Sequence, residues 1–72
     1  MEEQVLNIVS SFVGKSIEEL KNSINSDGVW DSLQKVEIVI ALEDEFDVAF
    51  GQEEIAEINT ISDFINKIQG KI

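Results

Sequence analysis

The sequence contains no cysteine, no histidine and no proline. The absence of cysteine excludes disulfide bonds and thiolate metal sites, and it favours a reducing compartment. Without histidine, the chain lacks the commonest metal ligand, the usual general base and the usual partner of a nucleophilic serine. We therefore expect the chain to have no catalytic residues and no dedicated metal site.

Positive charge is also scarce. Five basic residues stand against fifteen acidic ones, and the formal net charge is -10. Such a surface repels the phosphate backbone of nucleic acids, whereas a basic protein surface would suit it as a partner. The first residues, "MEEQVLNIVSSFVGK", lack a long apolar run, so we expect neither a signal peptide nor a membrane span, and we expect the cytoplasm as the location.

Apolar residues recur at three- and four-residue steps, which is typical of helices. A first helix ends at Gly14, a second runs from about Ser32 to Phe46 after the N-cap Asp31, and a short third covers 52–58. Thr60 is expected to cap the last helix. "SIEEL" has the form of a capping box and predicts one further helical turn. The sequence thus predicts a single all-α domain over residues 1–72. Its expected architecture is a four-helix bundle with three longer helices, a short third helix and a long loop between helices one and two.

The helix predicted at 32–46 carries two apolar stripes. We assign one to the core: Ile38, Val39, Leu42 and Phe46. The other mixes aliphatic and acidic residues: Leu33, Val36, Glu37, Ile40, Glu43 and Asp44. This second stripe has two interpretations. The helix is buried on two sides, or the stripe is an exposed docking strip whose carboxylates meet basic residues of a partner.

Ser32 stands directly behind Asp31 at the predicted start of that helix. The plain interpretation of this pair is a helix start. A catalytic serine would need a base, and the chain offers none with a suitable environment. A third interpretation is that another enzyme modifies Ser32, because a helix N-terminus favours a phosphate-linked group.

Two longer segments, "DSLQKVEIVIALEDEFDVAF" and "EEIAEINTISDFINKI", closely resemble the acyl carrier protein family, and the similarity covers nearly the whole chain. The resemblance implies a four-helix carrier domain. It implies that Ser32 bears 4'-phosphopantetheine, which a phosphopantetheinyl transferase takes from coenzyme A and which then holds acyl or aminoacyl groups as thioesters. It also implies that Asp31 assists recognition at Ser32, with Leu33 as the other motif neighbour.

By the same resemblance, the partner-facing residues are those of the second stripe: Leu33, Val36, Glu37, Ile40, Glu43 and Asp44. The implied partners are the transferase and acyl- or aminoacyl-loading and transfer enzymes with basic docking surfaces, and the implied state is a monomer. Ile55 and Ile58 match the family's short third helix, where they border the arm or belong to the core.

Trp30 departs from the fatty-acid members of the family, which carry a small or aliphatic residue at this position. "WDSL" is more similar to stand-alone carriers of specialised pathways, such as polysaccharide, polyketide, non-ribosomal peptide or D-alanyl transfer. The resemblance therefore favours a specialised pathway, and fatty-acid biosynthesis stays open as the alternative. Two roles for the indole stay open: it covers the end of the bundle, or it contacts the arm or a partner.

Two other functions compete with that of a carrier. One is an unmodified acidic adaptor that binds a basic partner through the helix of residues 32–46. The other is calcium binding by "EDEFDVAFGQEE". That segment does not fit an EF-hand, because taking Gly51 as the turn glycine places Phe46 at the first ligand position.

Overall fold

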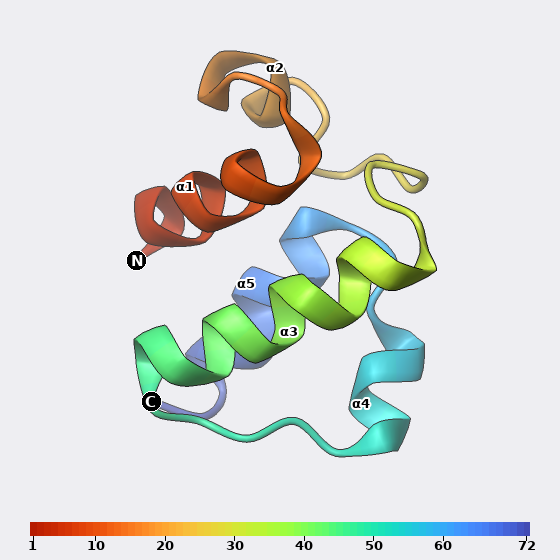
Figure 1. The fold of residues 1–72 in the computed structure, drawn as a ribbon. Helices are drawn as coiled ribbons and strands as arrows, with labels where there is room; N and C mark the ends of the chain where they lie inside the picture. Colours follow the sequence, from red (N-terminus) through yellow and green to blue (C-terminus); the bar gives the residue numbers. More distant parts are fainter.

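A computed structural model describes residues 1–72 as an all-helical fold with five helices and no strand (Figure 1). In chain order the helices are α1 (Glu2–Val13), α2 (Ile17–Lys21), α3 (Ser32–Phe46), α4 (Gln52–Glu57) and α5 (Ile61–Gln69). The two chain ends lie on the same side of the molecule in Figure 1.

Local signals in the sequence account for most helix ends. Gly14 ends α1 in the left-handed region with φ of 71°, a conformation that glycine adopts without steric cost. Ser16 begins α2 with a capping box in which its side chain accepts a hydrogen bond from the Glu19 N–H. Thr60 and Asp63 form the same motif at the start of α5.

The predicted helix over 32–46 is confirmed with its N-cap Asp31. The structure has five helices rather than the four predicted, because the expected turn at "SIEEL" forms a separate helix, α2, inside the first connection. Helix α4 ends one residue before the predicted 58, since Ile58 adopts an extended conformation.

The core is wholly apolar, and it draws on every helix except α4. Helix α1 packs against α2, α3 and α5, so the first helix of the chain contacts the last. The buried residues are Val5, Leu6, Val9, Leu20, Val29, Ile38, Val39, Leu42, Phe50, Ile58, Ile61, Phe64 and Ile68.

One predicted core residue differs from the other three of its stripe. Ile38, Val39 and Leu42 are buried, whereas Phe46 is only half-buried and packs against the rim of the core. Phe46 is the last residue of α3, where the helix leaves the core and Asp47 turns the chain in the left-handed region with φ of 53°.

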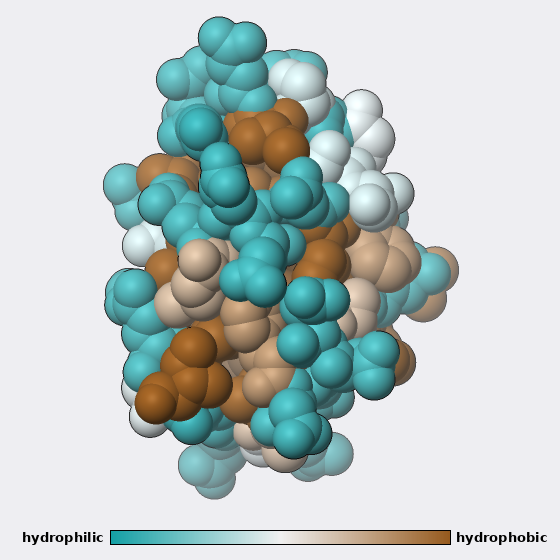
Figure 2. All heavy atoms as spheres, turned by 90° about the vertical axis from the view of Figure 1, so that its left-hand side faces the viewer, coloured by the Kyte–Doolittle hydropathy of each residue, from teal (hydrophilic) through white to brown (hydrophobic).

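The surface is mainly polar. Figure 2 shows one face on which hydrophilic side chains predominate and smaller hydrophobic areas lie between them. Four large apolar side chains are exposed: Leu33, Val36, Ile40 and Ile72. No helix combines the length and the apolar composition needed to cross a membrane.

Candidate functional site

Reciprocal hydrogen bonds define the start of α3. The Asp31 carboxylate accepts a hydrogen bond from the Gln34 N–H at 2.7 Å, and the Gln34 side-chain oxygen accepts one from the Asp31 N–H at 3.0 Å. The Gln34 amide also donates to the Phe12 carbonyl at 3.1 Å, which ties this turn to the end of α1. The start of α3 is therefore fixed both by its own capping box and by a hydrogen bond to α1.

Ser32 is the first residue of α3 and is exposed. Its hydroxyl makes no hydrogen bond within the chain, in contrast to those of Ser10, Ser11 and Ser16. The first N–H groups of a helix have no intrahelical acceptor, so this end carries a partial positive charge. The hydroxyl thus lies free beside a position that stabilises an anion.

A strip of exposed residues continues from Ser32 along α3. We call it the exposed strip, and it consists of Leu33, Val36, Glu37, Ile40 and Asp44. Leu33, Val36 and Ile40 are 70%, 52% and 60% exposed. Their spacing of three and four residues places them on one side of the helix. These exposures exclude the interpretation that α3 is buried on two sides.

The acids of the exposed strip form no ion pair within the chain. The two ion pairs of the molecule join Lys67 to Glu57 and Lys71 to Glu54, and neither involves a residue of α3. The carboxylates of Glu37 and Asp44 are consequently not neutralised within the chain. They lie beside aliphatic side chains in a molecule whose net charge is -10.

Glu43 is placed differently from the rest of the predicted partner-facing set. It is half-buried, and its carboxylate accepts a hydrogen bond from the Phe50 N–H at 2.8 Å. The contact anchors the connection between α3 and α4. Glu43 therefore has a structural function, and its contribution to docking stays a prediction.

Trp30 lies just before the helix start and covers part of the core. Its half-buried indole packs against the Phe64 ring with a centroid distance of 5.1 Å and an interplanar angle of 58°. This geometry is a favourable tilted aromatic pair. The structure thus supports the covering role for the indole, because the contact connects the residues before Ser32 to α5.

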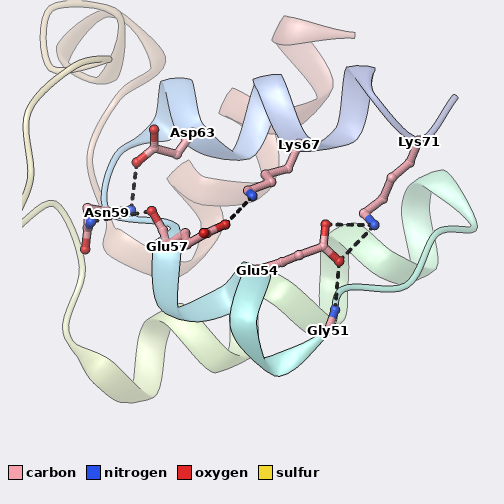
Figure 3. A network of polar contacts seen from close by, with 7 residues as sticks. All are labelled: Gly51, Glu54, Glu57, Asn59, Asp63, Lys67 and Lys71. Atoms are coloured by element: carbon pink, nitrogen blue, oxygen red, sulfur yellow. Dashed lines mark hydrogen bonds and ion pairs between the residues drawn. The ribbon is translucent and has the colours of Figure 1, made fainter.

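Polar contacts fasten α4 to α5 (Figure 3). Lys67 pairs with Glu57 at 2.6 Å, and Lys71 pairs with Glu54 at 2.9 Å. The Gly51 N–H and Lys71 lower the pKa of Glu54, because both stabilise its charged form. The hydrogen bond to Glu57 likewise raises the pKa of Lys67.

Asp63 completes this network at the start of α5. Its carboxylate accepts hydrogen bonds from the Asn59 N–H at 2.9 Å and from the Thr60 N–H at 3.1 Å. These bonds lower the pKa of Asp63 below its ordinary value near 3.8, although partial burial opposes the effect. The carboxylate holds the connection between α4 and α5 in place.

Sequence reasoning missed Gln34, which completes the capping box and reaches α1. The signal was present, because an aspartate followed three residues later by glutamine fits the capping-box pattern. Ile58, expected either in the core or beside the arm, is fully buried, whereas Ile55 is half-buried.

A protein-family model described as the phosphopantetheine attachment site matches residues 3–68. The match covers almost the whole chain, and the chain belongs to this family of phosphopantetheine-bearing carriers. Its members are not enzymes: they carry the 4'-phosphopantetheine group, which a phosphopantetheinyl transferase installs, and they present it to acyl-handling enzymes. The resemblance to acyl carrier proteins drawn from the sequence is thereby confirmed.

The start of α3 fits this prosthetic group. Attachment through a phosphodiester requires an accessible hydroxyl, and Ser32 is exposed and makes no hydrogen bond within the chain. The phosphate would lie next to the first N–H groups of α3, which favour negative charge. The exposed position of Ser32 and these N–H groups therefore suit a phosphate-linked group.

Proposed function

We propose that Ser32 is the residue to which 4'-phosphopantetheine is attached. The observation that carries the proposal is an exposed hydroxyl without a hydrogen bond, at the start of α3 and next to the exposed strip. Ser26 is also exposed and makes no side-chain hydrogen bond, but it lies in the connection before α3 and not at a helix start. Ser32 alone combines a free hydroxyl with a docking surface.

The attachment reaction needs no catalytic group from this chain. The Ser32 oxygen bonds to the phosphorus that bears the pantetheine in coenzyme A, and the bond to the second phosphate breaks. Adenosine 3',5'-bisphosphate leaves, and the hydroxyl proton passes to a base of the transferase. Once attached, the group supplies a terminal thiol for acyl or aminoacyl thioesters. Asp31 assists by holding the helix start and by marking the site for the transferase.

The exposed strip is the proposed docking surface for the transferase and for loading and transfer enzymes. Its aliphatic side chains lose water on contact with a partner, which favours association. Its unpaired carboxylates attract a basic surface and orient it. Glu43 is retained in this proposal as a secondary contact, because its half-buried carboxylate already accepts a hydrogen bond from the Phe50 N–H.

We place the cargo in specialised biosynthesis, such as polysaccharide, polyketide, peptide or D-alanyl transfer, rather than in fatty-acid synthesis. The bulky Trp30 before Asp31 supports this choice. We further propose that α1, α3, α4 and α5 form the four-helix carrier layout over the domain 1–72, with α2 as an addition to the first connection, and that the carrier acts as a monomer.

Intact-protein mass spectrometry tests the attachment residue. We expect that incubation with a broad-specificity phosphopantetheinyl transferase and coenzyme A adds one phosphopantetheine to the wild type. Ser32→Ala should gain none and keep its helical circular dichroism, whereas the matched variant Ser26→Ala should load like the wild type. Loading of a folded Ser32→Ala protein would overturn the assignment.

The exposed strip would equally serve an unmodified acidic adaptor that binds a basic partner through α3. The two functions differ in their need for the hydroxyl. If the active transferase leaves the folded wild-type protein unmodified, the adaptor becomes the better interpretation of the exposed strip.

A further inference from the structure

Ser32 is held in place through its neighbours and not through its own side chain. Before it, the Trp30 indole packs against the Phe64 ring of α5 with a centroid distance of 5.1 Å. After it, the Gln34 side chain reaches α1, where its amide donates a hydrogen bond to the Phe12 carbonyl at 3.1 Å. The exposed hydroxyl therefore lies between two residues that contact two different helices.

The Phe12 carbonyl is an acceptor that α1 cannot satisfy by itself. It belongs to the last turn of α1, where the carbonyls have no intrahelical donor. The Ser16 N–H, four residues further along, would be its partner in a longer helix, but it donates to the Glu19 side chain instead. The half-buried Gln34 amide supplies the missing donor from α3, so this contact joins the end of one helix to the start of another.

The two hydrogen bonds of the Gln34 side chain use different atoms. Its oxygen accepts from the Asp31 N–H at 3.0 Å and caps α3, which a glutamate in this position would do equally well. Its nitrogen donates to the Phe12 carbonyl, which an ionised glutamate cannot do because a carboxylate has no donor. The capping box thus needs only an acceptor, whereas the link to α1 needs the amide.

Only two side-chain hydrogen bonds join α1 to α3. One runs from Gln4 to Glu45 near the other end of α3, is exposed, and has a length of 3.5 Å, which is longer than is typical of a hydrogen bond. The other is the shorter, partly buried bond of Gln34, two residues from Ser32. The firmer of the two links therefore lies at the end of α3 that carries the attachment residue.

We propose that Gln34 is a positioning residue for the attachment of phosphopantetheine, because its amide ties the first turn of α3 to α1. This inference rests on the proposed attachment at Ser32. Helix ends fray, and a docked transferase needs the Ser32 oxygen at a fixed place relative to the phosphorus that it attacks. The link to α1 therefore acts on the kcat of the transferase. The KM for the carrier depends on the exposed strip and not on this link.

Gln34→Glu tests the proposal, since it keeps the acceptor of the capping box and removes the donor to Phe12. With the carrier varied at saturating coenzyme A, we expect the kcat of the transferase to fall by about three- to tenfold, the factor that corresponds to one hydrogen bond. The KM for the carrier should change by less than about twofold. The matched control is Gln4→Glu, which makes the same change in the other link between α1 and α3, and its kcat should equal that of the wild type.

Backbone ¹⁵N relaxation of the unloaded carrier provides a readout that does not involve the transferase. The amides of Ser32 and Leu33 should be rigid in the wild type, with order parameters of about 0.85, and should fall below about 0.6 in Gln34→Glu. Gln4→Glu should leave both values unchanged. Gln34→Met is a neutral variant of similar length that lacks both polar groups, and it should show the same losses of order and of kcat.

The outcomes separate this inference from the proposed function. If folded Gln34→Glu loads with the kcat of the wild type, or loses kcat without any loss of order at Ser32, Gln34 is not a positioning residue and the carrier assignment holds. An equal loss of kcat in Gln4→Glu would also overturn the inference, because the place of the link would then not matter. Order parameters below about 0.6 in the wild type would overturn it even if no Gln34 variant folds. If the wild type gains no arm at Ser32, the proposed function fails and this inference fails with it.

Discussion

The two sides of α3 carry the same kind of side chain in opposite surroundings. Ile38, Val39 and Leu42 are at most 4% exposed, whereas Leu33, Val36 and Ile40 are at least 52% exposed. Burial of one such side chain contributes about 1.5–3 kcal/mol. The three exposed side chains of α3 do not make this contribution to the stability of the chain. We propose that this surface, in which exposed aliphatic residues lie beside acids without an ion pair, is stabilised by contact with another protein.

The largest effect is expected on the buried side. Leu42→Ala should lower the free energy of unfolding by about 2–5 kcal/mol, because it removes buried methyl groups and leaves a cavity. On the exposed side, Ile40→Ala should change it by less than about 0.5 kcal/mol. Urea denaturation followed by circular dichroism measures both values. Comparable losses in the two variants would show that the exposed strip packs against the chain after all.

A smaller effect is expected on partner recognition. Val36→Ala and Glu37→Lys should each reduce the kcat/KM of the transferase for this carrier by on the order of tenfold, as expected for central interface residues. Their unfolding free energies should stay close to that of the wild type. Glu45→Lys, an exposed acid on α3 outside the exposed strip, is the matched charge control. An equal effect of Glu45→Lys would show that net charge rather than the exposed strip governs recognition.

The smallest effect on stability is expected for the polar contacts that join α4 and α5, which lie outside the two stripes of α3 compared above. The pKa of Asp63 is lowered in the folded state, so its carboxylate contributes stability that is fully present above its ordinary value near 3.8. That contribution is lost as the pH falls through the lower folded pKa. Urea titrations between pH 6 and pH 3 should therefore show Asp63→Asn less stable than the wild type at pH 6, with the difference narrowing at low pH. A difference that is constant over this range would contradict the role given to the charge.

The ends of the longer helices were predictable because they depend on local chemistry. Asp31 and Thr60 cap α3 and α5 through contacts within three residues, and Gly14 ends α1 with a backbone conformation that suits glycine. The separate helix α2 was expected only as a turn, since so short a segment depends on packing for its stability. Leu20, its one buried residue, provides that packing.

The residues of the candidate site could be singled out from the sequence, but the contacts they make could not. The second stripe of α3 follows from helical spacing, and Ser32 was singled out by the Asp-Ser pair at a predicted helix start and by the resemblance to acyl carrier proteins. The choice between a buried and an exposed second stripe needed the positions of the other helices. The use of Glu43 as an acceptor for the Phe50 N–H depends on the path of the connection after α3. No periodicity in the sequence specifies that path.

The order of residues alone determines that this chain is helical, acidic, without histidine, and marked by an Asp-Ser pair at a helix start. These properties depend on composition and on contacts three or four residues apart. The packing of α1 on α3 and α5 decided which apolar stripe of α3 is buried, and it left the exposed strip in water. The same packing brought Trp30, Phe64 and Phe50 together. Such contacts join residues distant in the chain, and only the fold as a whole sets their distances.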